Sequence, residues 1–242
     1  MQLLLDLWCG SKSFSRGFKE RGFICLSLDN NIHFTPTFCE DIFTWKPHPA
    51  FYKKFDVVTA GPVCTLVSTA RKNKTSEDFI TTRKMWERTF ELVDLLLKPN
   101  GVAIFENPGR TQVSSDTCYD FPVGIVKQLR PELWSTTVNY CMYSTSDRAF
   151  SNKQTKLWCN IDLSQYGFQA RRCTRDCRCI VGGINPRTGC YMHHKRLAFT
   201  PEQRNKLLQN ADTNKHGKWS EMPHQLIVDL ADASCAFMRA RE

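Results

Sequence analysis

Four residues that could do chemistry stand at or just beyond the ends of short apolar runs in the first half of the chain. They are Asp6, Asp29, Cys64 and Glu106. The apolar runs alternate with stretches of helical periodicity, which predicts a parallel sheet covered by helices on both faces. Ligands of such sheets bind beyond the carboxyl ends of the strands. The pattern therefore predicts that these four side chains serve one site.

Cys64 has the most specific setting of the four. A single cysteine is usually a packing residue, but Cys64 follows the strand-ending Gly61-Pro62 and precedes small polar residues. We therefore expect it in a loop at the functional edge of the sheet. A nearby cation, such as Arg71, could lower the pKa of its thiol and produce a nucleophilic thiolate. Glu106 ends the next strand and could supply a carboxyl group beside the thiol, although an isolated Glu there is often a salt-bridge or capping residue.

The loop after the first apolar run and two later acids have the pattern of a nucleoside-binding site. In Asp6–Gly10, followed by Phe14 and a helix, a tight turn would bring backbone amides close to an anionic group. Asp29, followed by Asn30, stands 23 residues after Asp6, where an acid can accept the hydroxyls of a ribose. Asp41 could accept the amino group of adenine. The alternative is a buried strand and turn with two surface acids.

The elements that position these residues follow from hydrophobic periodicity. We predict strands over 3–7, 24–28, 55–59, 102–105, 138–143 and 156–161. We predict helices over 14–21, 77–97, 201–209 and 223–236, the second of them ended by Lys98-Pro99-Asn100-Gly101. The fold class is α/β, with a cofactor-binding catalytic domain over 1–160. A small basic Cys/His-rich element over 161–200 and C-terminal helices over 201–242, which pack back on the first domain, complete the chain.

Taken in order, these motifs resemble those of the DNA (cytosine-5) methyltransferase family, especially its short viral and phage-like branch, over nearly the whole chain. The resemblance lies in a cofactor motif, a ribose-binding acid, a Pro-Pro-Cys nucleophile motif, a Glu-Asn motif, a base-contacting region and a closing motif. The corresponding segments are Asp6–Gly10, Asp29, Gly61-Pro62-Val63-Cys64, Phe105-Glu106-Asn107, Tyr140-Cys141-Met142-Tyr143 with 153–158, and Met222-Pro223 with the helix that follows.

The resemblance implies a Rossmann-like class I methyltransferase sheet with a small, irregular target-recognition element. It also implies S-adenosylmethionine as methyl donor and carbon 5 of cytosine in DNA as acceptor. Cys64 would add to carbon 6 of a flipped-out base, and Glu106 would act at ring nitrogen 3. Lys156 and Arg148 would contact the base. The cofactor would be bound by Asp6, Trp8, Gly10, Phe14, Asp29, Asn30, Asp41, Gly61 and Pro62.

Several positions depart from the family pattern. Lys12 and Ser13 replace the usual glycines, Val63 replaces the second proline, and Lys153 and Lys156 stand where paired arginines are usual. These departures leave open a catalytically weak relic that binds cofactor or nucleic acid. RNA cytosine, for example in a tRNA loop, is also open as the substrate. Methylation of an exocyclic amine is disfavoured, because that chemistry uses an Asp/Asn/Ser-Pro-Pro-aromatic loop.

The second half of the chain contains a basic segment with clustered cysteines. The net charge is +9, and residues 151–210 hold 11 Lys or Arg against 3 Asp or Glu. Such a segment suits contact with a phosphate backbone, and equally a solvated surface. Cys173, Cys177, Cys190 and His193 could bind a structural zinc ion, with Cys179 as a substitute ligand. Free cysteines in a basic loop are the alternative.

The remaining composition bears on compartment and partners. Twelve cysteines without a secretory leader favour reduced thiols in an intracellular protein of the cytoplasm or nucleus. No apolar run approaches the roughly 18 residues of a membrane span, so no membrane partner is expected. We expect a monomer whose partner is DNA, with RNA left open.

Overall fold

The computed structural model describes residues 1–66, 73, 75–109, 123–143, 153–173, 180–184, 191–193 and 221–241, of which 180–184 and 191–193 are described in their backbone alone. Seven strands form one sheet in the order β3-β2-β1-β4-β5-β7-β6. Their bounds are β1 Leu3–Leu7, β2 Ile24–Asp29, β3 Phe38–Cys39, β4 Phe55–Ala60, β5 Leu97–Pro108, β6 Trp134–Asn139 and β7 Gln154–Cys159. β8 (Ile180–Ile184) and β9 (Tyr191–His193) form a separate antiparallel pair.

The directions of the strands identify the sheet. β1, β2, β3, β4 and β5 pair in parallel, whereas β7 runs antiparallel to both β5 and β6. A mostly parallel sheet with one reversed strand inserted beside its edge is the sheet of the Rossmann-like class I methyltransferases. The fold class expected from the sequence is therefore confirmed.

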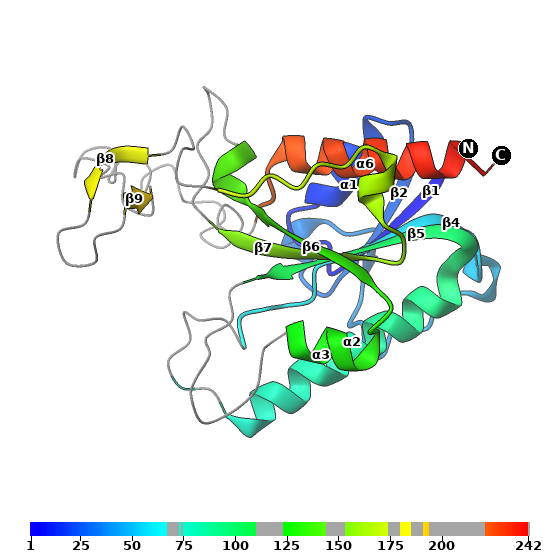
Figure 1. The fold of residues 1–242 in the computed structure, drawn as a ribbon. Coiled ribbons are helices and arrows are strands. Elements are labelled where there is room, and N and C mark those ends of the chain that lie inside the picture. Colours follow the sequence, from blue (N-terminus) through cyan, green and yellow to red (C-terminus); the bar gives the residue numbers. More distant parts are fainter. Residues whose placement is uncertain are drawn as a thin grey trace.

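Helices cover both faces of this sheet (Figure 1). α1 (Ser13–Lys19) and α6 (His224–Arg239) lie on one face, and α2 (Ser76–Leu96) and α3 (Val123–Leu129) lie on the other. Four short 3-10 turns join the elements: η1 Ile32–Phe34, η2 Pro49–Phe51, η3 Tyr140–Tyr143 and η4 Leu163–Tyr166. Because both faces are covered, the central strands are apolar throughout rather than alternating with polar residues.

Two hydrophobic cores result, one on each side of the sheet. Successive residues of a strand point to opposite faces, so Val57 belongs to the core under α1 and α6 while Val58 belongs to the core over α2. Trp86 of α2 is fully buried against Phe90 and Trp158, with ring centroids 5.5 and 5.6 Å apart. A capping box at Thr75 and Asp78 begins α2, so the long helix has a defined start.

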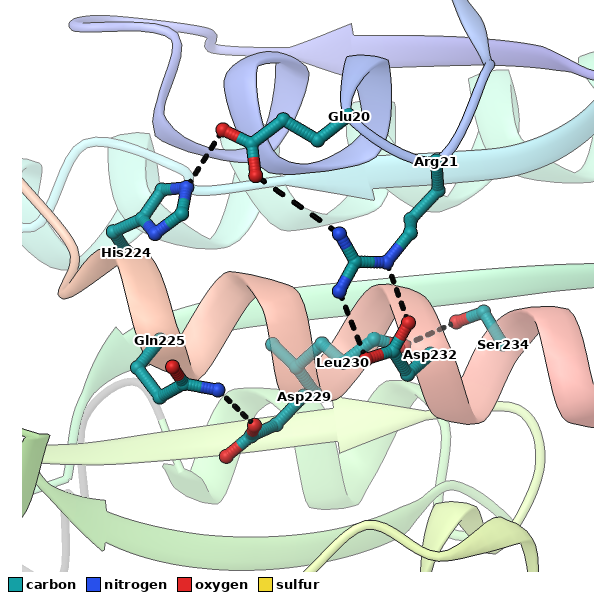
Figure 2. Close-up of polar contacts among 8 residues, drawn as sticks. All are labelled: Glu20, Arg21, His224, Gln225, Asp229, Leu230, Asp232 and Ser234. Carbon is teal, nitrogen blue, oxygen red and sulfur yellow. Dashed lines mark hydrogen bonds and ion pairs between the residues drawn. The ribbon is translucent and has the colours of Figure 1, made fainter.

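Polar contacts join the two residues that follow α1 to the last helix, α6 (Figure 2). The Glu20 carboxylate lies 2.8 Å from Nε2 of His224, and Arg21 binds both oxygens of Asp232 at 2.5 and 2.9 Å. These side chains are partly exposed, so each pair contributes at most about 1 kcal/mol. The main attachment is apolar: Leu226, Ile227 and other residues of α6 are buried in the same core as α1.

The close approach of α1 to α6 depends on Gly17. A Cβ added at Gly17 would lie 2.4 Å from Cγ2 and 3.0 Å from Cβ of Ile227. We expect Gly17→Ala to lower the free energy of unfolding by about 1–3 kcal/mol through overpacking, as measured by urea denaturation. In the Gly17→Ala background, Ile227→Ala should lower the free energy of unfolding by less than it does in wild type, because it removes the clashing Cγ2. Additive losses would contradict this contact.

The structure differs from the sequence-based elements mainly beyond residue 120. The predicted strand over 138–143 is wrong, since β6 spans Trp134–Asn139 and a 3-10 turn follows it. The strand predicted over 156–161 begins two residues earlier, at Gln154. β3 and α3 were not predicted. The predicted 201–209 helix lies outside the described residues, and the domain boundaries stay predictions. No helix in the described ranges has the length and apolarity needed to cross a membrane.

Candidate active site

The loops that follow β1, β2, β4 and β5 lie at one edge of the sheet. The parallel register places Leu7 of β1 beside Leu28 of β2 and Ala60 of β4, and Ala60 beside Phe105 of β5. The chain leaves β1 through α1 on one face and leaves β4 through α2 on the other. Connections that diverge in this way mark the topological switch point of the sheet, the position beyond which α/β sheets bind ligands.

The loop after β1 has an unusual backbone. Trp8, Gly10 and Lys12 all have left-handed φ values, of 56°, 44° and 58°. An L-residue in this region costs roughly 1 kcal/mol, which explains why glycine is usual where this chain has Lys12. The Lys12 ammonium donates to the backbone oxygen and to the hydroxyl of Thr35. The amides of this loop donate within the protein: Cys9 N–H donates to the Leu28 carbonyl at 3.1 Å and Lys12 N–H donates to the Cys9 carbonyl at 2.7 Å, so the loop is tied to the end of β2 and to itself.

Asp29 is held in place by two backbone amides. Gly10 N–H donates to Oδ2 at 3.0 Å and Asn31 N–H donates to Oδ1 at 2.9 Å. Each carboxylate oxygen keeps a lone pair that could accept a hydroxyl group. Asn30 is exposed beside it, and exposed Asp41 accepts from the Phe43 amide at 2.9 Å. The fold thus presents both acids at the ends of neighbouring strands, as a nucleoside site requires.

Two exposed apolar side chains lie near these acids, and sequence reasoning did not single them out. Ile32 is 63% exposed and Phe43 is 42% exposed, although both are large hydrophobic residues. The ring of Phe43 contacts Trp8 edge to face at 6.4 Å, and the Trp8 indole N–H donates to the Thr89 hydroxyl at 3.0 Å. Their position directly after Asp29 and Asp41 could have revealed them. Exposed apolar groups beside a polar clamp suit a planar ligand.

Asp6 lies beneath the loop and is buried in the protein interior. It is 1% exposed; Ser15 O–H donates to Oδ2 at 2.8 Å and Thr59 O–H donates to Oδ1 at 2.9 Å. These bonds tie β1 to α1 and β4. Burial raises the pKa of Asp6 to about 7, against the lowering effect of the hydrogen bonds. Phe14 is likewise in the core, 4% exposed. Both support the loop, and a direct contact of either with a ligand stays a prediction.

The raised pKa of Asp6 makes stability depend on pH. The folded-state pKa of about 7 lies above the ordinary value of 3.8, so between these two pH values the folded chain binds a proton that the unfolded chain does not. The contribution of Asp6 to stability is therefore fully present below about pH 4 and is lost as pH rises toward 7. Between about pH 4.5 and 7.5, wild type should lose a few kcal/mol more than Asp6→Asn in urea denaturation, at about 1.4 kcal/mol per pKa unit. Equal losses would contradict this assignment.

Cys64 and Glu106 come together with two further side chains. Oε1 of Glu106 accepts from the Tyr140 hydroxyl at 3.0 Å and from the Lys153 ammonium at 3.2 Å. The charges of Glu106 and Lys153 both act on the Cys64 thiol, so the four groups form one cluster. Burial raises the pKa of the Cys64 thiol, as does Glu106, while Lys153 lowers it. The cluster lies at the ends of β4 and β5, beside the loop that follows β1.

Asn107 fixes the Cys64 loop to β5. Its side-chain N–H donates to the Pro62 carbonyl at 2.7 Å, and Asn107 is 2% exposed. Gly61 N–H donates to the Leu7 carbonyl at 3.4 Å, which joins the same loop to β1. Val63, by contrast, is 40% exposed. The loop therefore keeps its attachment to both neighbours although it has a single proline.

The structure brings Lys153 to Glu106, whereas the sequence-based choice was Lys156. Lys156 lies opposite Asn107 in the β5–β7 pairing and is half-buried. Burial, followed by the charge of Arg172, lowers the pKa of Lys156. Its contact with a base stays a prediction. Arg71 and Arg148 lie outside the described residues.

The metal ligands expected from the sequence fall mostly outside the described part of the chain. Cys173 is partly buried and contacts the buried Cys141. Cys177, Cys179 and Cys190 are not described, and His193 is described in its backbone alone. The described residues contain no group of three or more His, Cys, Asp or Glu side chains placed to hold a metal ion. The zinc site stays a prediction without support from the described structure.

The solved structures that are similar to this chain share little sequence identity with it. No family model matches the sequence, and no curated protein matches it. A solved structure assigned as a DNA modification methyltransferase encoded within a prophage of E. coli is 14% identical, with a TM-score of 0.45, over 68% of this chain and 48% of that one. A 30S ribosomal A1408 methyltransferase from an uncultured bacterium is 12% identical, with a TM-score of 0.36, over 65% of this chain and 86% of that one. This chain thus spans about half the length of the first protein.

Proposed function

We propose that this protein transfers a methyl group from S-adenosylmethionine to carbon 5 of cytosine in DNA through a covalent adduct of Cys64. One observation carries the proposal: the Cys64 thiol and the Glu106 carboxylate come from neighbouring strand ends and interact electrostatically, beside the loop that follows β1. Asn107 fixes their relative position by holding Pro62. A thiol and a carboxylate so placed suit addition to a pyrimidine ring better than direct transfer to an amine.

The chemistry of the residues that follow β2 and β3 suits the proposed cofactor. Asp29, oriented by Gly10 and Asn31, would accept the ribose hydroxyls. Asp41 would accept the adenine amino group, and the exposed faces of Ile32 and Phe43 would cover the ring. When bound, S-adenosylmethionine supplies an electrophilic methyl group. Gly61 contacts both sides: its N–H donates to the Leu7 carbonyl at the end of β1, and a Cβ added to it would lie 3.7 Å from Oε2 of Glu106.

The proposed reaction assigns one task to each residue. The Cys64 thiolate adds to carbon 6 of cytosine, and Glu106 stabilises the displaced charge by protonating or hydrogen-bonding ring nitrogen 3. Carbon 5, now nucleophilic, takes the methyl group. Loss of the carbon 5 proton to solvent restores the double bond and expels the Cys64 thiolate. The sum is cytosine and S-adenosylmethionine giving 5-methylcytosine, S-adenosylhomocysteine and a proton. A paired base could not reach Cys64, so the base must be flipped out.

A trapping experiment tests this proposal. The protein is incubated with tritiated S-adenosylmethionine and duplex DNA of mixed sequence, single-stranded DNA, or RNA, and incorporation is measured. In parallel, DNA containing 5-fluorocytosine is supplied, because loss of fluorine from carbon 5 is blocked and the adduct persists. We expect tritium in DNA and a covalent complex that withstands denaturation. The peptide that carries the adduct should contain Cys64.

Each other outcome has a defined meaning. Incorporation into RNA and not into DNA would change the substrate but keep the reaction. Incorporation without an adduct on the fluorinated base would remove Cys64 as the nucleophile. Neither incorporation nor adduct on any of the nucleic acids, with cofactor binding shown by calorimetry, would leave a cofactor-binding relic and overturn the enzyme.

A further inference from the structure

Two side chains without a task in the proposed reaction hold Glu106 from the side of β6 and β7. Tyr140, directly after β6, and Lys153, directly before β7, both donate to Oε1, at 3.0 and 3.2 Å. In the described structure Oε2 accepts no hydrogen bond and is directed toward Gly61, whose added Cβ would lie 3.7 Å away. Glu106 is thus held by one oxygen, and its other oxygen is presented to the loop that contains Cys64.

Lys153 is itself held firmly. Its ammonium lies 4.9 Å from the centre of the Tyr140 ring, a cation–π distance, and Tyr140 N–H donates to the Lys153 carbonyl at 3.0 Å. The Lys153 side chain is 22% exposed and that of Glu106 is 12% exposed. Burial lowers the pKa of Lys153, but the charges of Glu106, Tyr140 and Cys64 together raise it above its ordinary value. Lys153 therefore remains a cation near neutral pH.

The charges of this cluster are coupled. While Glu106 is an anion, its charge opposes ionisation of Cys64, and the favourable charge of Lys153 is largely offset. If a bound base neutralised Glu106, the lysine would become the only uncompensated charge among these groups. A cation beside a thiol favours the thiolate. The order of events would then be base binding first and activation of the nucleophile second.

We propose, on the basis of the function given above, that Lys153 is a positioning residue that holds Glu106 by one oxygen and stabilises the Cys64 thiolate once a bound cytosine has neutralised Glu106. In this step the S–H bond of Cys64 breaks and its electron pair stays on sulfur. Glu106 has by then taken up a proton from solvent and hydrogen-bonds to ring nitrogen 3 of the bound base, and the proton of Cys64 leaves to solvent. The charge of the cluster is unchanged, and the thiolate faces Lys153 instead of the carboxylate. The thiol is thereby kept unreactive until a substrate base is in place.

The test measures the ionisation of Cys64 directly. Alkylation of the full-length protein by iodoacetamide is followed across about pH 6 to 10, with the Cys64 peptide quantified by mass spectrometry. Lys153→Met should move the alkylation profile of Cys64 to higher pH by about one unit. Lys153→Arg should restore most of the shift, because it keeps the charge. Lys127→Met removes an exposed lysine of α3 and should leave the profile unmoved.

The same variants are assayed for methyl transfer. Lys153→Met should lower the rate about 10- to 100-fold, and Lys153→Arg should recover much of it. An alkylation profile of Lys153→Met that coincides with wild type would overturn the inference, whatever happens to the rate. If Lys153→Met and Lys153→Arg both change the temperature of thermal unfolding, the substitutions disturb the fold. The alkylation profile of Lys153→Arg, compared with that of wild type, then decides whether the charge at residue 153 acts on Cys64. Alkylation needs no methyl donor, so this result is independent of whether the proposed reaction itself is found.

Discussion

Cys64→Ser should abolish methyl transfer while leaving the cofactor site intact. A serine hydroxyl fits the space of the thiol but ionises far too weakly to add to a pyrimidine. Loss of an attacking nucleophile commonly costs about 10⁴-fold or more in rate. We expect tritium incorporation to fall at least this far and the adduct with 5-fluorocytosine to disappear. Binding of S-adenosylmethionine, measured by calorimetry, should change by less than about twofold, because Asp29 and its amide donors are untouched.

Another partly buried cysteine gives a matched control. Cys235 lies in α6 and packs against the core that α6 shares with α1. Burial raises the pKa of its thiol, as it raises that of Cys64. Cys235→Ser should retain the methyl-transfer rate. If Cys64→Ser kept a substantial rate as well, the reaction would proceed by direct transfer and the covalent mechanism would be wrong.

The placement of Cys64, Glu106 and Asp29 at one edge of the sheet could be predicted from the sequence for one physical reason. Each lies at the end of a buried parallel strand, and parallel strand ends share an edge whatever the details of the loops. Strand bounds that are wrong by a residue do not alter this conclusion. The fold class followed from the same alternation of apolar runs and helical stretches. These features depend on local sequence and on a topology with few alternatives.

Tyr140 and Lys153 could not be assigned in the same way. Their meeting with Glu106 depends on the antiparallel register that places Glu106 opposite Leu157. A strand drawn from residue 156 leaves Lys153 three residues away from it, whereas Lys153 directly precedes β7, which begins at Gln154. Similarly, a strand over 138–143 conceals the turn that directs Tyr140 to Glu106. Register between distant strands is a tertiary property that periodicity does not reveal.

The backbone of the loop after β1 explains the role of Lys12. Lys12 is unexpected at a glycine position, and its φ of 58° shows that the position does require a left-handed residue. Lys12 adopts this left-handed conformation although it is not a glycine, and its side chain contacts Thr35. The departure therefore preserves the turn. Loss of the cofactor site does not follow from the missing glycine.

Glu106→Gln should act in opposite directions on methyl transfer and on the reactivity of Cys64. The amide keeps the shape of Glu106 and can still contact Tyr140, but it carries no charge and cannot give a proton to ring nitrogen 3. We expect methyl transfer to fall about 10²- to 10³-fold, the usual cost of removing a group that stabilises developing charge. At the same time the pKa of Cys64 should fall, because the nearby negative charge is gone and Lys153 remains.

The two measurements together distinguish a chemical role for Glu106 from a structural one. Iodoacetamide alkylation of Cys64 should proceed at lower pH in Glu106→Gln than in wild type. Glu87→Gln, which removes an exposed carboxylate paired with Arg83 on α2, should change neither property. If Glu106→Gln slowed both alkylation and methyl transfer, the variant would have displaced the Cys64 loop, and the assignment of Glu106 as the charge-stabilising group would fail. A faster alkylation with a slower reaction follows only if the carboxylate both restrains the thiol and serves the base.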